Sequence, residues 1–303
     1  MPTSFLPAVS ALRAAAEPTR LRLLALLAQA ELTVGEICEI VAQSQPRVSR
    51  HLKVLCDAGL LDRFREQHWV YYRAPAAGGT REVVHRLLAF VREDDEVLRR
   101  DRRRMQRVIA ERARDAANQL PDASRTAGSE ELDSIVLNEL GPEPVGALLD
   151  VGTGAGHLLG LLGSRASRAI GIDISSDALR VARTKVHGAG LSHCELQRGD
   201  MYDLPFAAEL FDTATADRVL ASADRPVRVL QELSRVLKPR GRAVVIEDFE
   251  ALGSIGKSNP ITLLRGWLGS AGLECVRVHP VDTASGHLLV ALARRVAQTT
   301  AAA

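Results

Sequence analysis

Apolar residues recur at helical spacing in four short stretches near the start of the chain. The pattern predicts helices over about 5–16, from Thr19 as the capping residue, over 34–42 with Thr33 as the cap, and from Pro46 to residue 58, where Gly59 ends the helix. Two β-prone runs, 61–65 and 69–73, follow and predict a hairpin. This order is typical of a winged helix-turn-helix, in which the hairpin is the wing.

A single long, highly charged helix is predicted over 81–118. Its apolar residues, from Val84 to Ile109, form a broken stripe at three-to-four spacing. Such a stripe needs a partner, so we expect a dimerisation helix, and the alternative is packing onto its own domain. Pro121 and residues 122–129 predict a linker.

From residue 130 the pattern alternates between strand and helix. Strands are predicted at 147–151, 169–173, 193–197, 211–216, 242–248, 273–279 and 287–293, with helices at about 156–163, 176–187, 226–236 and 261–270. This alternation predicts a doubly wound, Rossmann-like, seven-stranded and mostly parallel sheet whose last two strands form an antiparallel hairpin. The fold class is therefore multidomain, α+β then α/β. The expected boundaries are 1–80 for DNA binding, 81–129 for the long helix and linker, 130–296 for the α/β domain and 297–303 for a disordered tail.

Composition narrows the classes of protein to consider. The chain has 303 residues, 46% of them hydrophobic, and no run of 18 apolar residues, so we expect no membrane span. The first residues do not resemble a secretion signal, and the four cysteines are far apart, which favours reduced thiols in a cytoplasmic protein. Residues 1–118 carry 20 Lys and Arg against 15 Asp and Glu, net +5, whereas the remainder is net −3. A basic first part is typical of contact with nucleic acid.

The helix after the predicted turn carries polar residues that suit duplex DNA. The run 44–55, Ser-Gln-Pro-Arg-Val-Ser-Arg-His-Leu-Lys-Val-Leu, together with 17–24, resembles the ArsR/SmtB family of bacterial repressors. The helical spacing of Val48, Leu52 and Leu55 predicts that they face inward, which leaves polar side chains outward that can meet bases and phosphates of an operator. The candidate DNA-binding residues are Ser44, Gln45, Arg47, Ser49, Arg50, His51 and Lys53, with Arg65 and His68 on the wing. The stretch 31–37 has no thiol and Cys38 stands alone, so we expect no metal site.

A glycine motif and an acid mark a nucleoside site in the second part. Residues 148–156 read Leu-Leu-Asp-Val-Gly-Thr-Gly-Ala-Gly, and Asp173 ends the next predicted strand, 21 residues after Gly152. Glycines let the backbone approach a ligand, and a carboxylate can accept ribose hydroxyls. Across 130–295 the chain resembles class I S-adenosylmethionine-dependent methyltransferases.

The resemblance implies a role for each candidate in binding an adenosyl ligand. The glycine loop would lie beneath the amino-acid and ribose parts, Asp173 would bind the ribose, and Asp150 would orient the loop or bind the ammonium through water. The third strand would provide contacts to adenine, and the fourth would end near the sulfonium. The candidate residues are Asp150, Gly152, Thr153, Gly154, Gly156, Asp173, Ile174, Asp200, Met201, Ala216 and Asp217.

The residues for a methyl acceptor depart from the related pattern. Relatives that join these two domains usually carry aromatic residues before the glycine loop and histidines after the fourth and fifth strands. Here 118–133 has no aromatic residue, and 216–222 and 248–260 have no histidine. No catalytic residue is identified. We expect a homodimeric repressor that senses S-adenosylmethionine or S-adenosylhomocysteine. The alternatives are a repressor that also transfers methyl groups, and an enzyme whose winged helix serves dimerisation.

Overall fold

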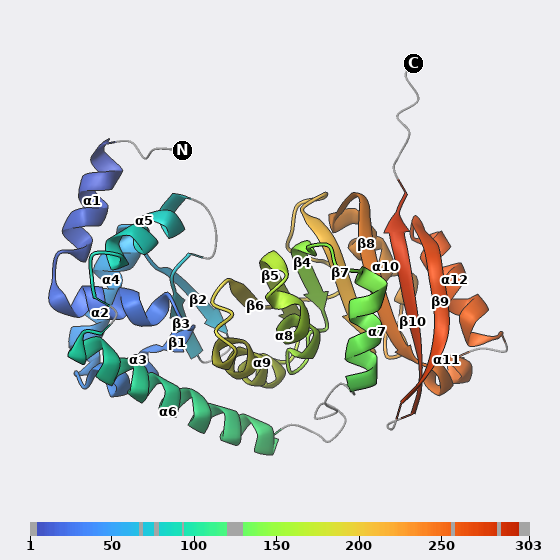
Figure 1. Ribbon diagram of the computed structural model, residues 1–303, viewed down its shortest axis with the longest axis horizontal. Coiled ribbons are helices and arrows are strands. Elements are labelled where there is room, and N and C mark those ends of the chain that lie inside the picture. Colours follow the sequence, from blue (N-terminus) through green and yellow to red (C-terminus); the bar gives the residue numbers. More distant parts are fainter. Residues whose placement is uncertain are drawn as a thin grey trace. The chain divides into compact units, whose positions relative to one another are not determined.

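The chain forms two compact units, and the computed structural model describes residues 5–66, 69–75, 79–92, 94–119, 130–255, 258–283 and 286–296 (Figure 1). Unit 1 consists of Met1–Gln119 together with Arg183–His193, and unit 2 of the remaining residues. Helix α9 (Ser176–Gly188) therefore contributes its first half to unit 2 and its last turns to unit 1. The expected linker, 121–129, and the expected tail, 297–303, lie outside the described residues.

Unit 1 contains the predicted helix-turn-helix and wing. Its helices are α1 (Phe5–Ala15), α2 (Pro18–Leu27), α3 (Val34–Val41) and α4 (Gln45–Asp57), and its strands are β1 (Leu32–Thr33), β2 (Asp62–Glu66) and β3 (Trp69–Arg73). The three strands form an antiparallel sheet in the order β1-β3-β2. The buried core joins side chains from all four helices and from the sheet.

The helix ends show local chemistry that the sequence only partly predicted. Thr33 caps α3 in a capping box with Glu36, as expected. The expected cap of α2 was wrong: Glu17, not Thr19, accepts from the backbone N–H of Arg20, at 2.8 Å. Pro18 explains the difference, because it occupies the first helical position and places the cap one residue earlier.

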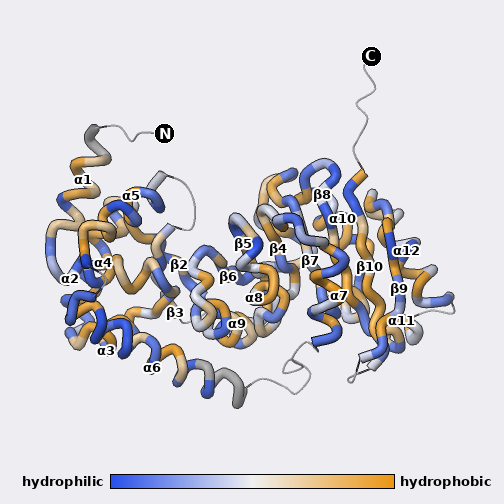
Figure 2. The backbone as a smooth tube through the Cα atoms, viewed as in Figure 1, coloured by the Kyte–Doolittle hydropathy of each residue, from blue (hydrophilic) through white to orange (hydrophobic). Residues whose placement is uncertain are grey.

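The single helix expected over 81–118 is two helices, α5 (Gly79–Leu88) and α6 (Glu96–Gln119). The side chain of Asp95 accepts from the backbone N–H groups of Val97 and Leu98, so it starts α6 as an N-cap. The apolar positions along mostly hydrophilic α6 are visible in Figure 2. Met105, Val108 and Ile109 are buried in the core of unit 1, where α6 packs against α2 and α3. Part of the stripe thus packs onto its own domain, and dimerisation stays a prediction.

Unit 2 is the predicted doubly wound sheet. Its strands are β4 (Gly146–Val151), β5 (Ala166–Asp173), β6 (Cys194–Arg198), β7 (Phe211–Asp217), β8 (Leu237–Asp248), β9 (Leu273–Thr283) and β10 (Gly286–Arg295). Their order is β6-β5-β4-β7-β8-β10-β9, and the first five in this order run parallel. Strand β10 is antiparallel to both its neighbours, which confirms the expected hairpin.

Helices cover this sheet, and two of them were not predicted. The helices are α7 (Glu130–Leu140), α8 (His157–Gly163), α9, α10 (Pro226–Val236), α11 (Phe249–Ile255) and α12 (Pro260–Ser270). Helices α7 and α11 were not predicted from the sequence. Leu132, Val136 and Leu140 of α7 are buried and have the four-residue spacing of one helix face. The large core of unit 2 lies between the sheet and its helices.

Candidate ligand and DNA sites

The glycine loop follows β4 in a backbone conformation that few other residues adopt. Gly152, Gly154 and Gly156 have φ angles of 67°, 51° and 75°. A Cβ atom added at Gly152 would lie 2.5 Å from Cγ2 of Val219, and one at Gly156 would lie 2.9 Å from Cβ of Ala182. The glycines are therefore required both by the turn and by close packing on each side of it.

Asp173, at the end of β5, is bound to the glycine loop. One carboxylate oxygen accepts from the backbone N–H of Gly154 at 2.8 Å, and the other accepts from that of Ser175 at 2.8 Å. Each carboxylate oxygen has a second lone pair, so the group can still accept two hydroxyls of a ribose. Ile174 beside it is 66% exposed, as suits an apolar residue that a flat base would cover.

Asp150 lies beneath the loop. Its two oxygens accept from the hydroxyls of Thr153 and Thr215, each at 2.6 Å, and the residue is buried. Burial, together with the charges of Asp217 and Asp173, raises its pKa to about 6, against the two threonine hydrogen bonds that lower it. These contacts suit a residue that orients the glycine loop.

The other candidates lie at the ends of the neighbouring strands. Asp200, after β6, is exposed and accepts from the backbone N–H of Tyr202 at 2.9 Å, and Met201 is half-buried. In β7, Ala216 is buried. The Asp217 carboxylate accepts from Nε and Nη2 of Arg218, at 2.9 and 3.0 Å. Its negative charge is therefore balanced by the guanidinium of Arg218.

The sheet topology brings these residues to one edge. Strands β4, β5, β6 and β7 are parallel, so their carboxyl ends meet on the same side. The chain order reverses between β4 and β7, which are direct neighbours. Ligands of doubly wound folds bind in the crevice at such a reversal. The structure therefore gathers the candidate ligand residues where the fold class places a nucleoside.

Two features near this edge were not predicted from the sequence. Nε2 of His157, at the start of α8, lies 2.6 Å from a carboxylate oxygen of Asp133 in α7. Glu247 in β8 is fully buried and accepts from the backbone N–H groups of the loop after β7. An acid inside the apolar run Val-Val-Ile-Glu was the available sequence signal for Glu247.

In unit 1, helix α4 presents a polar face as predicted. Val48, Leu52 and Leu55 are buried. The remaining residues of this helix and its cap divide by exposure: Ser44, Gln45, Arg47, Arg50 and Lys53 are exposed, and Ser49 is half-buried. The spacing that predicted an inward apolar stripe thus also leaves a continuous outward surface.

Four candidates on and near this face differ in their surroundings. His51 is turned toward α2, with its Nδ1 3.6 Å from a carboxylate oxygen of Glu17, so its ring has a partner inside the unit. Lys53 is paired with Asp57 at 2.9 Å on the exposed surface. Arg65 is exposed on β2, and His68 lies outside the described residues.

A buried ionic cluster joins the end of α9 to the rest of unit 1. Nε of Arg183 donates to Glu31 at 2.7 Å and Nη1 to Glu66 at 2.6 Å, and its guanidinium carbon lies 4.4 Å from the ring centre of Tyr71. Burial disfavours the charge of Glu31, but Arg183 and Arg73 outweigh it and lower the pKa of the carboxyl. Burial also lowers the pKa of His187 to about 3, so this histidine is neutral. Glu66 belongs to the wing, and Glu31 precedes β1.

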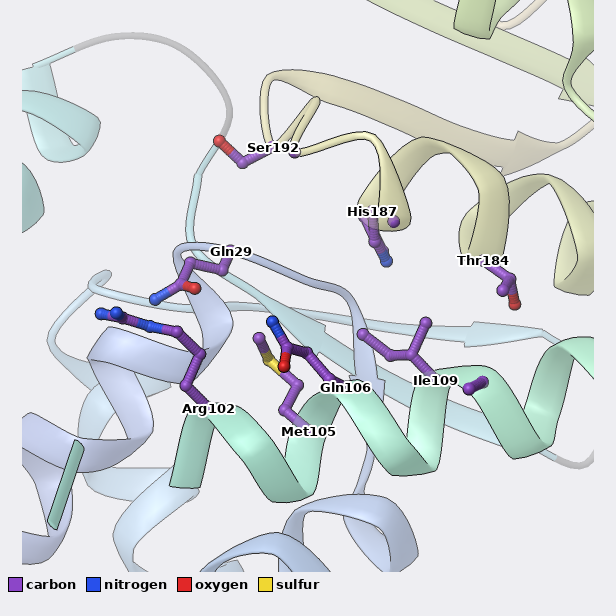
Figure 3. Close-up of a pocket in the computed structure, with 11 residues that line it drawn as sticks. Gln29, Arg102, Met105, Gln106, Ile109, Thr184, His187 and Ser192 are labelled. Atoms are coloured by element: carbon purple, nitrogen blue, oxygen red, sulfur yellow. The ribbon is translucent and has the colours of Figure 1, made fainter. Parts of the chain in front are cut away.

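Beside this cluster, unit 1 has a cavity of about 610 Å³ along α6 (Figure 3). The side chains of α6 and of the α9 end face each other across it, with Gln29 at one side. The labelled lining includes Gln29, Arg102, Met105, Gln106, Ile109 and His187.

The described part of the chain contains neither a cluster of metal-binding side chains nor a helix that could span a membrane. No group of three His, Cys, Asp or Glu side chains there could hold a metal ion. No helix in that part of the chain combines the length and apolar character of a membrane span.

Comparison with protein families supports both parts. The model described as "Bacterial regulatory protein, arsR family" matches residues 17–63, and the one described as "Methyltransferase domain" matches residues 149–245. The chain carries an ArsR-family helix-turn-helix domain and a methyltransferase domain. The matched ranges contain α2 to the start of the wing, and β4 to most of β8.

The chain is similar to several known proteins over part of its length. It is 34% identical over 150 residues to an uncharacterized 37.1 kDa protein in transposon TN4556 of Streptomyces fradiae, across 48% of this chain and 43% of that protein. It is 37% identical over 105 residues to a phosphatidylethanolamine N-methyltransferase of Cereibacter sphaeroides, across 34% of this chain and 51% of that enzyme. The chain thus spans about half the length of these relatives. A solved SAM-dependent methyltransferase from Aquifex aeolicus is 24% identical, covers 57% of this chain and 96% of its own, and has a TM-score of 0.47.

Proposed function

We propose that the protein is a homodimeric, DNA-binding transcriptional regulator, a repressor, whose methyltransferase domain binds S-adenosylmethionine or S-adenosylhomocysteine as an effector. The observation that carries this proposal is the combination, in one chain, of an exposed polar recognition helix and a glycine loop bound to Asp173. The methyl-cycle genes that make and consume these ligands are the expected targets, and the cytoplasm is the expected compartment.

The state of the methyl-acceptor side favours a sensor over an enzyme. Methyl transfer needs an acceptor held in line with the methyl group, commonly beside a base. At the end of β7, Asp217 is tied to Arg218 rather than left as a free base. On the ligand side, in contrast, Asp150 and Asp173 both form hydrogen bonds with the glycine loop.

Helix α9 supplies a continuous route between the two functions. Ala182 of α9 lies against Gly156 of the glycine loop, and the next residue, Arg183, is the buried cation that binds Glu66 of the wing. A helix transmits displacement along its axis because its backbone hydrogen bonds keep it rigid. A ligand that moves the glycine loop can therefore bias the ionic cluster, which begins at the next residue of α9.

An effector acts only if it binds the DNA-competent and incompetent states with different affinity. A coupling free energy of about 1–3 kcal/mol, common for allosteric proteins, would change operator affinity roughly 5–150-fold.

A second candidate is a regulator that also transfers methyl groups. The observation in its favour is the match of residues 149–245 to the methyltransferase family, together with the similarity to an N-methyltransferase. Incubation with labelled S-adenosylmethionine and candidate acceptors distinguishes the two, since a pure sensor transfers no label.

Ligand binding is tested by substituting Asp173. Asp173→Ala removes the acceptor for the ribose hydroxyls and a bond to the glycine loop, so we expect affinity for S-adenosylhomocysteine to fall by roughly a hundredfold or more, the sum of two charge-assisted hydrogen bonds. Isothermal titration calorimetry measures this directly. Asp177→Ala, at an exposed position in the first turn of α9, is the matched control and should bind normally. Equal affinity in the Asp173 variant and the control would refute the proposed site.

A further inference from the structure

Glu247 is a buried acid for which the proposed function so far has no use. It is the second-to-last residue of strand β8, and its exposed fraction is 0%. No ion pair to Glu247 is found among the described residues. A buried carboxylate without a cation is costly unless hydrogen bonds satisfy it.

Three consecutive backbone N–H groups satisfy this carboxylate. One oxygen accepts from Val219 at 2.9 Å and from Leu220 at 2.6 Å, and the other accepts from Ala221 at 3.2 Å. These donors belong to the loop that follows β7. Glu247 thus holds that loop by its main chain, independently of the side chains in it.

The held loop is in turn packed against the ligand site. Val219 is 6% exposed, and its Cγ2 occupies the space beside Gly152, where even a Cβ atom would lie within 2.5 Å. Gly152 is the first residue of the glycine loop. A displacement of Val219 therefore reaches the backbone on which the ligand would rest.

We propose that Glu247 is a positioning residue for the adenosyl-ligand site, which fixes the loop 219–221, and through Val219 the glycine loop, in the conformation that binds ligand. The inference rests on the proposed function for its ligand, but the loop contact it invokes exists without one. It also predicts that ligand affinity depends on pH in the neutral range.

The pH dependence follows from the acceptor role. Burial raises the pKa of Glu247 to about 7, in spite of the three backbone hydrogen bonds, and the charge of Asp217 adds to the rise. The charged groups that interact with it are Asp217 of β7 and Arg218, which follows that strand. A protonated carboxyl is a weaker acceptor for the three N–H groups, and its buried O–H needs an acceptor of its own. The loop should therefore loosen as pH falls below about 7.

Two measurements on the full-length protein test the inference. Hydrogen exchange of the amides of Val219, Leu220 and Ala221 is compared, without ligand and at equal pH, in the wild type, Glu247→Gln and Glu250→Gln; the last alters an exposed acid of α11 and is the control. Calorimetry with S-adenosylhomocysteine is then run between about pH 6 and pH 8.5, a range that spans the titration.

We expect Glu247→Gln to lose exchange protection at the three amides and to bind roughly tenfold more weakly at pH 8. Its affinity should no longer change near pH 7 and should keep only the change that Asp150 contributes near pH 6. The wild type and Glu250→Gln should keep protection and bind more weakly as pH falls through about 7. Unchanged protection in Glu247→Gln, or a pH profile like that of the wild type, would overturn the inference. If Glu247→Gln does not fold, the wild-type profile decides, and a flat profile overturns it. If Glu247→Gln loses protection at the three amides but the wild type binds no ligand, the loop contact is supported and only the proposed function is refuted.

Discussion

At the scale of single residues, the acidic side chains of the ligand site already have hydrogen-bond partners within the protein. Asp173 is bonded to the glycine loop, Asp217 to Arg218, and Asp150 to two threonines. The sequence showed which residues these are, since strands and glycines mark them. It did not show the partners: Thr215 carries no motif and reaches Asp150 only through the register of β4 and β7, and no motif indicates that Arg218 pairs with the acid directly before it.

The raised pKa of Asp150 makes stability depend on pH. Its pKa of about 6 in the folded state exceeds the ordinary value of 3.8 for an aspartate. The folded state therefore holds the proton more tightly, so this group favours folding below about pH 4, and its contribution is lost as pH rises through about 6. Relative to Asp150→Asn, the wild type should lose up to about 3 kcal/mol of unfolding free energy between pH 4 and pH 7, at about 1.4 kcal/mol per pKa unit.

Urea unfolding at the two pH values checks this prediction. The chain has two tryptophans, and the Trp69→Phe background leaves Trp267 of α12 as the reporter for unit 2. A difference between the variants that is the same at both pH values would contradict the predicted linkage.

On α4, Arg47 and Arg50 are exposed beside the predicted DNA surface. Replacing either by Ala should weaken operator binding, by about 1–3 kcal/mol if it reads a base, or with a salt slope reduced by about 1 if it meets a phosphate. Fluorescence anisotropy at several salt concentrations separates the two. Arg86→Ala, on the exposed surface of α5, is the control. Operator affinity equal to that of the control would remove the assigned role from α4.

At the scale of elements, periodic patterns predicted well and boundaries set by side chains did not. The strands of unit 2 and the antiparallel β10 were foreseen because apolar runs and turn residues are local signals. The division into α5 and α6 was missed, because it depends on the cap that Asp95 provides inside a stretch that is otherwise helical in pattern. The ionic cluster of Arg183 was not foreseeable, since its partners are more than a hundred residues away.

Helix α9 is the element for which a regulatory role can be tested most clearly. Arg183→Met leaves Glu31 and Glu66 buried without their shared cation, which typically costs about 3–5 kcal/mol, so a lower melting temperature is expected. Because the ligand contacts lie elsewhere, binding of S-adenosylhomocysteine should persist while its effect on operator affinity falls to within about twofold. Lys185→Met, exposed on the same helix, is the control. Full retention of the ligand effect in a folded Arg183 variant would show that α9 is not the route.

At the scale of the whole molecule, the unit with the helix-turn-helix and the unit with the doubly wound sheet share helix α9. A dimer would double both sites, so that two recognition helices meet successive turns of a palindromic operator. Self-association is expected to be needed for specific binding, because one winged helix contacts only one half-site.

The central claim is that an adenosyl ligand changes how the protein binds DNA. The most direct measurement is operator affinity by fluorescence anisotropy, on a fragment selected by the protein itself, with no ligand, with S-adenosylmethionine and with S-adenosylhomocysteine. We predict that one of the two ligands shifts the affinity roughly 5–150-fold and that Asp173→Ala abolishes the shift. An operator affinity that stays constant while calorimetry shows the same sample saturated with ligand would contradict the claim.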